Sequence, residues 1–160
     1  MTSFLRYNGH MRDPAQSPDF PDSFHRVAIK GLVVREGKLL LLKESEELGG
    51  GWELPGGGLD FGENIHQALR REVQEETSLT VARISEKPVY TWTTRFENKR
   101  GIDWYYSLVV AYGMELENLD FKSSKECVGI GFFSKEELDG IPLCLQSIAL
   151  KTIFNPSDFA

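Results

Sequence analysis

The stretch GGLDFGENIHQALRREVQEETSL, residues 57–79, carries the strongest structural signal in this chain. Asn64 is a favourable N-cap residue, and the segment after it keeps helical periodicity as far as Ser78. The apolar residues at that spacing are Ile65, Ala68, Leu69 and Val73. The stretch therefore predicts a glycine-rich loop followed by an amphipathic helix.

Three glutamates of this helix do not lie on the face opposite to its apolar residues. At about 100° per residue, Glu72 and Glu76 fall within the apolar stripe and Glu75 falls at its edge. Carboxylates on a desolvated face repel one another, and a divalent cation compensates for that repulsion. We therefore expect these three hard oxygen donors to bind Mg²⁺, with Mn²⁺ as the alternative metal. The competing interpretation is a solvated helix face held by pairs such as Arg71–Glu75.

The glycines at 56–58 come directly before this helix. A glycine-rich turn allows close approach of the backbone, and its main-chain carbonyls can face a metal. An ordinary turn uses the same residues, so the loop alone is weak evidence. Next to a helix with three carboxylates, it predicts a site for a metal-bound phosphate.

The whole stretch from Gly57 to Leu79 resembles the Nudix box, GX5EX7REUXEEXGU, in which U is a bulky apolar residue. Every charged position matches, without an insertion. Ser78 replaces the final glycine of the box, at a helix end where glycine adopts the left-handed conformation cheaply. This replacement costs about 1 kcal/mol or less and removes no metal ligand. The resemblance implies a Nudix-like α/β/α sandwich with a mixed β-sheet.

The resemblance also implies roles for individual residues. The implied metal ligands are the carboxylates of Glu72, Glu75 and Glu76 and the carbonyl oxygen of Gly57. Glu63 supports the geometry of the loop and helix, and Arg71 belongs to the catalytic set as a brace of that geometry. The implied reaction is the hydrolysis of a nucleoside diphosphate linked to another group, by attack of water on phosphorus.

A carboxylate must accept the proton of the attacking water. In the family this base is a glutamate of the box, here Glu72 or Glu75, or a carboxylate from a later loop. Glu126 is our candidate for the later carboxylate, because it precedes a predicted strand and its flanking lysines would keep it ionised. The competing acidic residues are Glu115, Glu117 and Asp120.

The rest of the chain predicts one α/β domain over residues 24–160. Residues 1–23 are polar and rich in proline, so we expect an arm that lies on the domain or has no fixed structure. Apolar and β-branched runs predict strands at 27–34, 38–43, 52–54, 81–96, 103–114 and 128–133, and a last helix at 143–154. The predicted hairpins argue against a purely parallel sheet and favour a mixed one.

Composition narrows the choice of partners and compartment. The net charge of −6 argues against a nucleic-acid or anionic membrane partner. Neither a run of transmembrane length nor a secretory signal is evident. We expect Cys127 and Cys144 to be free thiols in a reducing compartment. We therefore expect a cytoplasmic protein with a nucleotide-type small-molecule substrate. The sequence does not decide between a monomer and a homodimer.

Two classes of function agree with these features. The first is a Nudix pyrophosphohydrolase acting on a nucleoside triphosphate or a nucleotide sugar. The second is an inactive Nudix-fold module that binds nucleotides or regulates a partner. All box carboxylates and the box arginine are present, which favours the enzyme. The substrate markers that the family often carries beyond the box, a proline or a tyrosine, are absent near residues 92–96.

Overall fold

A computed structural model describes residues 6–7, 10–11, 23–99 and 102–159 of the chain. Most of the predicted N-terminal arm, residues 1–23, lies outside the described residues. Within it, strands β1 (Arg6–Tyr7) and β2 (His10–Met11) pair in antiparallel fashion. The division between an arm and a domain stays a prediction.

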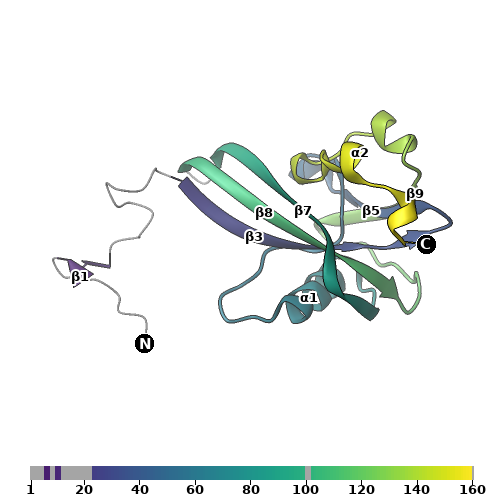
Figure 1. Ribbon diagram of the computed structural model, residues 1–160, viewed down its shortest axis with the longest axis horizontal. Helices are drawn as coiled ribbons and strands as arrows, with labels where there is room; N and C mark the ends of the chain where they lie inside the picture. The colour runs from purple at the N-terminus through teal and green to yellow at the C-terminus, as the bar shows by residue number, and fades with distance from the viewer. Residues whose placement is uncertain (1–5, 8–9, 12–22, 100–101, 160) are drawn as a thin grey trace.

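Two β-sheets form the body of the described structure (Figure 1). The first contains β3 (Ser23–Leu32), β8 (Ile102–Leu116) and β7 (Val81–Lys99), in that spatial order. Strand β3 runs parallel to β8, whereas β7 runs antiparallel to it. The mixed sheet that the hairpins predicted is therefore confirmed.

In the second sheet, β5 (Lys38–Glu44) pairs antiparallel with each of its three neighbours. These neighbours are β4 (Val34–Arg35), β6 (Trp52–Glu53) and β9 (Cys127–Phe133). The turn between β4 and β5 has positive φ angles of 49° at Glu36 and 73° at Gly37. This geometry belongs to a tight hairpin, as the sequence predicted.

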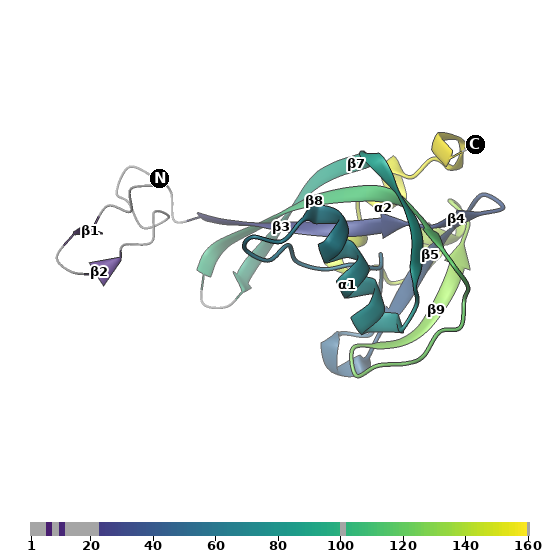
Figure 2. The same ribbon diagram turned by 90° about the horizontal axis from the view of Figure 1, so that it is seen from below.

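Helical elements cover the sheets on two sides. Helix α1 (Ile65–Thr77) lies on one side, and α2 (Leu150–Ile153) lies on the other (Figures 1 and 2). Each side has its own core cluster: Leu69 and Val73 of α1 belong to one, and Leu150 of α2 belongs to the other. The structure therefore has the layered α/β arrangement that the resemblance implied.

The prediction of one helix over residues 143–154 is wrong in extent. Only α2 is α-helical there, and it follows a 3₁₀ turn at Leu145–Ser147. The backbone before that turn is bonded to β6: Trp52 N–H donates to the Pro142 carbonyl, and Cys144 N–H donates to the Trp52 carbonyl. Because these tertiary bonds hold the chain extended, helical periodicity does not decide its conformation. The other 3₁₀ segments within the described residues are Glu46–Leu48, Glu137–Gly140 and Pro156–Phe159.

Two smaller expectations can be compared with the structure. Cys127 is buried and Cys144 is half-buried, and both are free thiols, as predicted. Among the described residues, we find no helix with the length and apolar character needed to cross a bilayer.

Gly56 provides a test of the packing between the glycine-rich loop, β3 and α1. Its φ is +113°, and an added Cβ would collide with the Ile29 carbonyl oxygen and meet Leu69 Cδ1 at 2.9 Å. We expect Gly56→Ala to lower the free energy of unfolding by about 2–4 kcal/mol, measured by urea denaturation. Gly62→Ala is the matched control, because Gly62 has a φ of +81° but nothing within 4 Å of the added atom. Equal losses in the two variants would contradict this account.

Candidate active site

Helix α1 is capped at both ends as its sequence predicts. The Asn64 side chain accepts a hydrogen bond from His66 N–H at 2.9 Å. Ser78 ends the helix with φ 59° and ψ 13°, which is the left-handed conformation that the box glycine would adopt. Serine therefore takes the required geometry here, and the departure from the box leaves the helix intact.

The glycine-rich loop is fastened to the edge of β3 by backbone hydrogen bonds. Ile29 N–H donates to the Gly57 carbonyl at 2.8 Å, and Gly31 N–H donates to the Pro55 carbonyl at 2.9 Å. The Glu72 carboxylate packs so closely against Gly57 that an added Cβ would overlap it. The loop thus places the backbone of Gly57 between β3, which binds its carbonyl, and the Glu72 carboxylate of the helix.

Arg71 holds the loop and the helix together. Its guanidinium forms a bidentate pair with Glu63, with N–O distances of 2.8 and 2.9 Å. Its other hydrogen bonds go to Glu72 at 2.7 Å, Glu75 at 3.3 Å and the Gly58 carbonyl at 3.4 Å. A guanidinium has five N–H donors. These bonds use all of them, so Arg71 acts here as a brace and offers no donor to a substrate.

The carboxylates of the helix meet a separate loop at one cavity. A cavity of about 200 Å³ is lined by Glu72, Glu75, Glu76, Ser124, Lys125 and Glu126. A second cavity of about 90 Å³ is lined by Glu53, Glu76 and Glu126, with residues of β5 and β9. The structure thus brings Glu126, far away in sequence, to the glutamates of the box.

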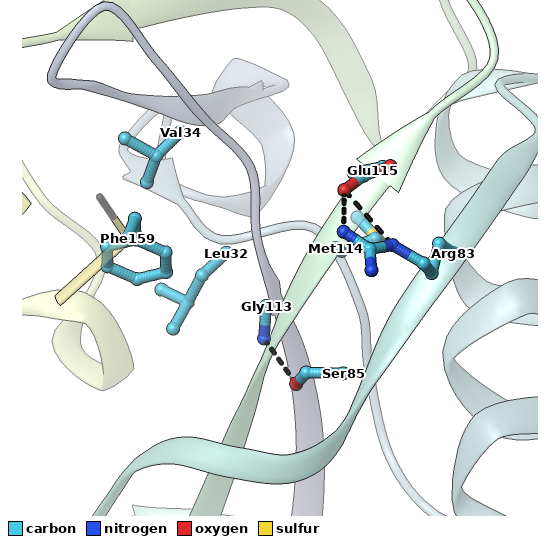
Figure 3. Close-up of a pocket in the computed structure, with 8 residues that line it drawn as sticks. All are labelled: Leu32, Val34, Arg83, Ser85, Gly113, Met114, Glu115 and Phe159. Carbon is cyan, nitrogen blue, oxygen red and sulfur yellow. Dashed lines mark hydrogen bonds and ion pairs between the residues drawn. The ribbon is translucent and has the colours of Figure 1, made fainter.

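The three competing acidic residues lie elsewhere. Glu115 pairs with Arg83 at the surface and lines a different cavity, of about 250 Å³, together with Leu32 and Phe159 (Figure 3). Glu117 and Asp120 are exposed, and neither is among the described residues that line the two carboxylate cavities.

Burial separates the box glutamates from one another. The Glu75 side chain is 61% exposed, whereas that of Glu72 is 19% exposed. Burial also raises the pKa of Glu76 to about 7, although Lys30 nearby acts in the opposite direction. The Glu76 carboxylate accepts a hydrogen bond from Gly56 N–H at 3.1 Å. The helical wheel therefore ranked the three side chains correctly.

Two charged residues of the site were not found from the sequence. Glu53 lies on β6 and lines the smaller cavity. Lys30 is buried in β3 and pairs with Glu53, with a distance of 3.1 Å from Nζ to Oε2. The available signal for Lys30 was a single charge within the apolar run 27–34. For Glu53, the strand of only two residues offered no periodicity to interpret.

The donor set fits a hard divalent cation. Carboxylate and main-chain carbonyl oxygens are the ligands that Mg²⁺ and Mn²⁺ prefer. Across the described ranges, no group of three acidic, histidine or cysteine side chains converges closely enough to hold an ion in the present rotamers. Glu72 and Glu75 are each held by Arg71 through one oxygen, so each retains a second oxygen as a donor.

The raised pKa of Glu76 predicts how the stability of the metal-free protein depends on pH. The folded-state pKa of about 7 exceeds the ordinary 4.5, so Glu76 destabilises the fold increasingly between pH 4.5 and 7, and the full cost is present above pH 7. In the presence of a chelator, Glu76→Gln should raise the free energy of unfolding by up to about 3 kcal/mol at pH 8. The gain should shrink steadily as the pH falls from 7 and should vanish only well below pH 4.5, where Glu76 is protonated in both the folded and the unfolded state.

Urea denaturation across this pH range tests the prediction. The control is Glu75→Gln, which removes an exposed charge and should change stability by about 0.5 kcal/mol or less at every pH. A gain for Glu76→Gln that does not vary with pH would contradict the assignment of the buried charge.

Comparison with known proteins agrees with this geometry. The sequence of residues 24–152 matches the protein-family model of the NUDIX domain. A MutT-like protein of Streptomyces ambofaciens is 39% identical over 87 residues, which are 54% of this chain and 54% of the relative. The match therefore spans about half the length of that relative. The nucleoside triphosphatase NudI of Escherichia coli is 28% identical over 120 residues, covering 71% of this chain and 84% of NudI.

The solved structures show the same fold. The crystal structure of a MutT Nudix hydrolase from Burkholderia pseudomallei superposes with a TM-score of 0.62 at 23% identity. The superposition covers 82% of this chain and all of that one (100%). With the domain match over most of its length, this chain belongs to the Nudix hydrolase family.

Proposed function

We propose that this protein is a metal-dependent pyrophosphohydrolase that cleaves a nucleoside diphosphate linked to another group, of the nucleoside triphosphate or nucleotide-sugar type. The observation that carries the proposal is the cavity in which the box carboxylates of α1 meet Glu126 of a separate loop. Membership of the Nudix family supports the reaction class. The nucleoside triphosphatase among the relatives supports a nucleotide as the substrate.

Four groups would hold the divalent cation in this proposal: the carboxylates of Glu72, Glu75 and Glu76 and the carbonyl oxygen of Gly57. When bound, such a cation neutralises diphosphate oxygens and lowers the pKa of an attacking water. Arg71 keeps two of the carboxylates in place, and Glu63 keeps Arg71 in place through the bidentate pair. Mg²⁺ is the proposed ion and Mn²⁺ the alternative.

Glu126 is the proposed acceptor of the proton from water. Its side chain lines both carboxylate cavities, so it can face the reacting phosphate from the side opposite to the helix. Lys125 lines the larger cavity as well, next to Glu126 in the sequence. The box glutamates remain the alternative base, since Glu72 and Glu75 line the larger cavity too.

The alternative of an inactive module is less consistent with this arrangement. An inactive module has no need to keep carboxylates on a partly desolvated face, where each costs folding free energy. Glu76 has that cost, because burial raises its pKa.

The direct test is a screen for phosphate and pyrophosphate release from nucleoside triphosphates, nucleotide sugars, ADP-ribose and dinucleoside polyphosphates. We expect turnover with Mg²⁺ or Mn²⁺ and none after exhaustive chelation.

Glu75→Gln should lower kcat by at least about a hundredfold, because it removes a charge that acts in the transition state. Glu86→Gln, an exposed change on β7, is the control and should stay within about twofold. Full turnover in the chelated protein would refute the metal dependence.

A second experiment separates Glu126 from its competitors. Glu126→Gln should lower kcat by about tenfold or more and change KM much less, because a general base acts on the chemical step. Glu115→Gln is the matched variant, since it only breaks an exposed ion pair with Arg83. If Glu115→Gln were crippled while Glu126→Gln turned over normally, the assignment of the loop carboxylate would be wrong.

A further inference from the structure

Strand β3 contains a lysine that is almost completely buried. Lys30 is 3% exposed, and its neighbours Ile29 and Gly31 are buried as well. Lysine is almost never fully buried unless it is paired. Burial favours the neutral amine, but the carboxylates of Glu53, Glu76 and Glu72 outweigh it and raise the pKa of Lys30. Lys30 is therefore positively charged inside the protein at neutral pH.

The hydrogen bonds of Lys30 show what this cation holds. Its Nζ donates to Glu53 Oε2 at 3.1 Å, to the Leu54 carbonyl at 3.1 Å and to the Gly56 carbonyl. An ammonium group has three N–H donors. All of them have acceptors within the protein, so Lys30 has none left for a substrate phosphate.

The turn at residues 54–57 is held by Lys30 on one side and by the box helix on the other. The Gly56 carbonyl accepts from Lys30, while the Gly56 N–H donates to the carboxylate of Glu76 at 3.1 Å. The next carbonyl, that of Gly57, is held by Ile29 of the same strand at 2.8 Å. One peptide segment therefore connects Lys30, Glu76 and the carbonyl that we assign to the metal site.

We infer that Lys30 is a positioning residue: it fixes the turn at 54–57 and thereby orients the Glu76 carboxylate and the Gly57 carbonyl for a divalent cation. The inference rests on the proposed metal-dependent function. The alternative is that the ammonium group of Lys30 only substitutes for a metal ion by neutralising the carboxylates. A fixed positive charge that competes with the metal would weaken metal binding, so its removal would strengthen it. A positioning role requires the opposite sign.

Binding of Mn²⁺ alone distinguishes these cases without any turnover. Lys30→Met keeps an unbranched side chain, one atom shorter, and removes its charge and donors. We expect the Kd for Mn²⁺, measured by electron paramagnetic resonance of the free ion, to rise by about tenfold or more, as for outer-shell partners of other metal sites. Val109→Ala is the control: it truncates a fully buried residue of β8 outside the site and should leave the Kd within about twofold.

Both variants are compared at a temperature at which circular dichroism shows them to be folded. If Lys30→Met does not fold, Lys30→Gln takes its place, because glutamine is smaller and retains two N–H donors. An unchanged or a tighter Kd in the folded variant overturns the positioning role while leaving the proposed function intact. A wild-type protein that binds no Mn²⁺ overturns the proposed function and this inference together.

Discussion

Negative charge on a partly buried helix face is the constraint on which the rest of this site depends. The Glu72 side chain on this face is 19% exposed, and burial raises the pKa of Glu76 on the same face. Two fixed cations compensate for them within the protein. Arg71 binds Glu72 from the helix itself, and Lys30 lies near Glu76 from inside β3. These two cations therefore offset part of the cost of burying the acidic cluster.

The same constraint explains the glycines of the loop. The turn must pass between the edge of β3 and the carboxylates of α1, and side chains do not fit there. A Cβ at Gly56 would collide with the Ile29 carbonyl, and one at Gly57 would overlap the Glu72 carboxylate. Close approach rather than flexibility is thus the reason for glycine at these two positions. This close approach places backbone peptide groups, which are strong hydrogen-bonding groups, beside buried charged side chains that require hydrogen-bonding partners.

The site also shows how the fold divides its tasks. Helix α1 supplies three carboxylates in one rigid array, while the fourth comes from the segment before β9. Arg71 uses its donors within the site, and so does Lys30, so neither cation is free to bind a phosphate. Among the described residues that line the two carboxylate cavities, Lys125 is the cation that forms no hydrogen bond or ion pair, and it borders the cavity proposed for the nucleotide phosphates.

The sequence by itself determined how the box residues are arranged, because their arrangement depends on local helical periodicity. Asn64 caps the helix, and the helical wheel places Glu72 and Glu76 on the buried face and Glu75 at its edge. Short-range pairing also made the hairpins and the mixed sheet predictable. Only the tertiary structure decided which distant residues join this array. Glu126 meets the box because β9 pairs with β5, and Lys30 meets Glu53 because β3 is hydrogen-bonded to the loop that follows β6. Such long-range contacts leave no periodic signal in the chain. The segment at 143–154 failed as a helix for the same reason, since bonds to β6 outweigh its local propensity.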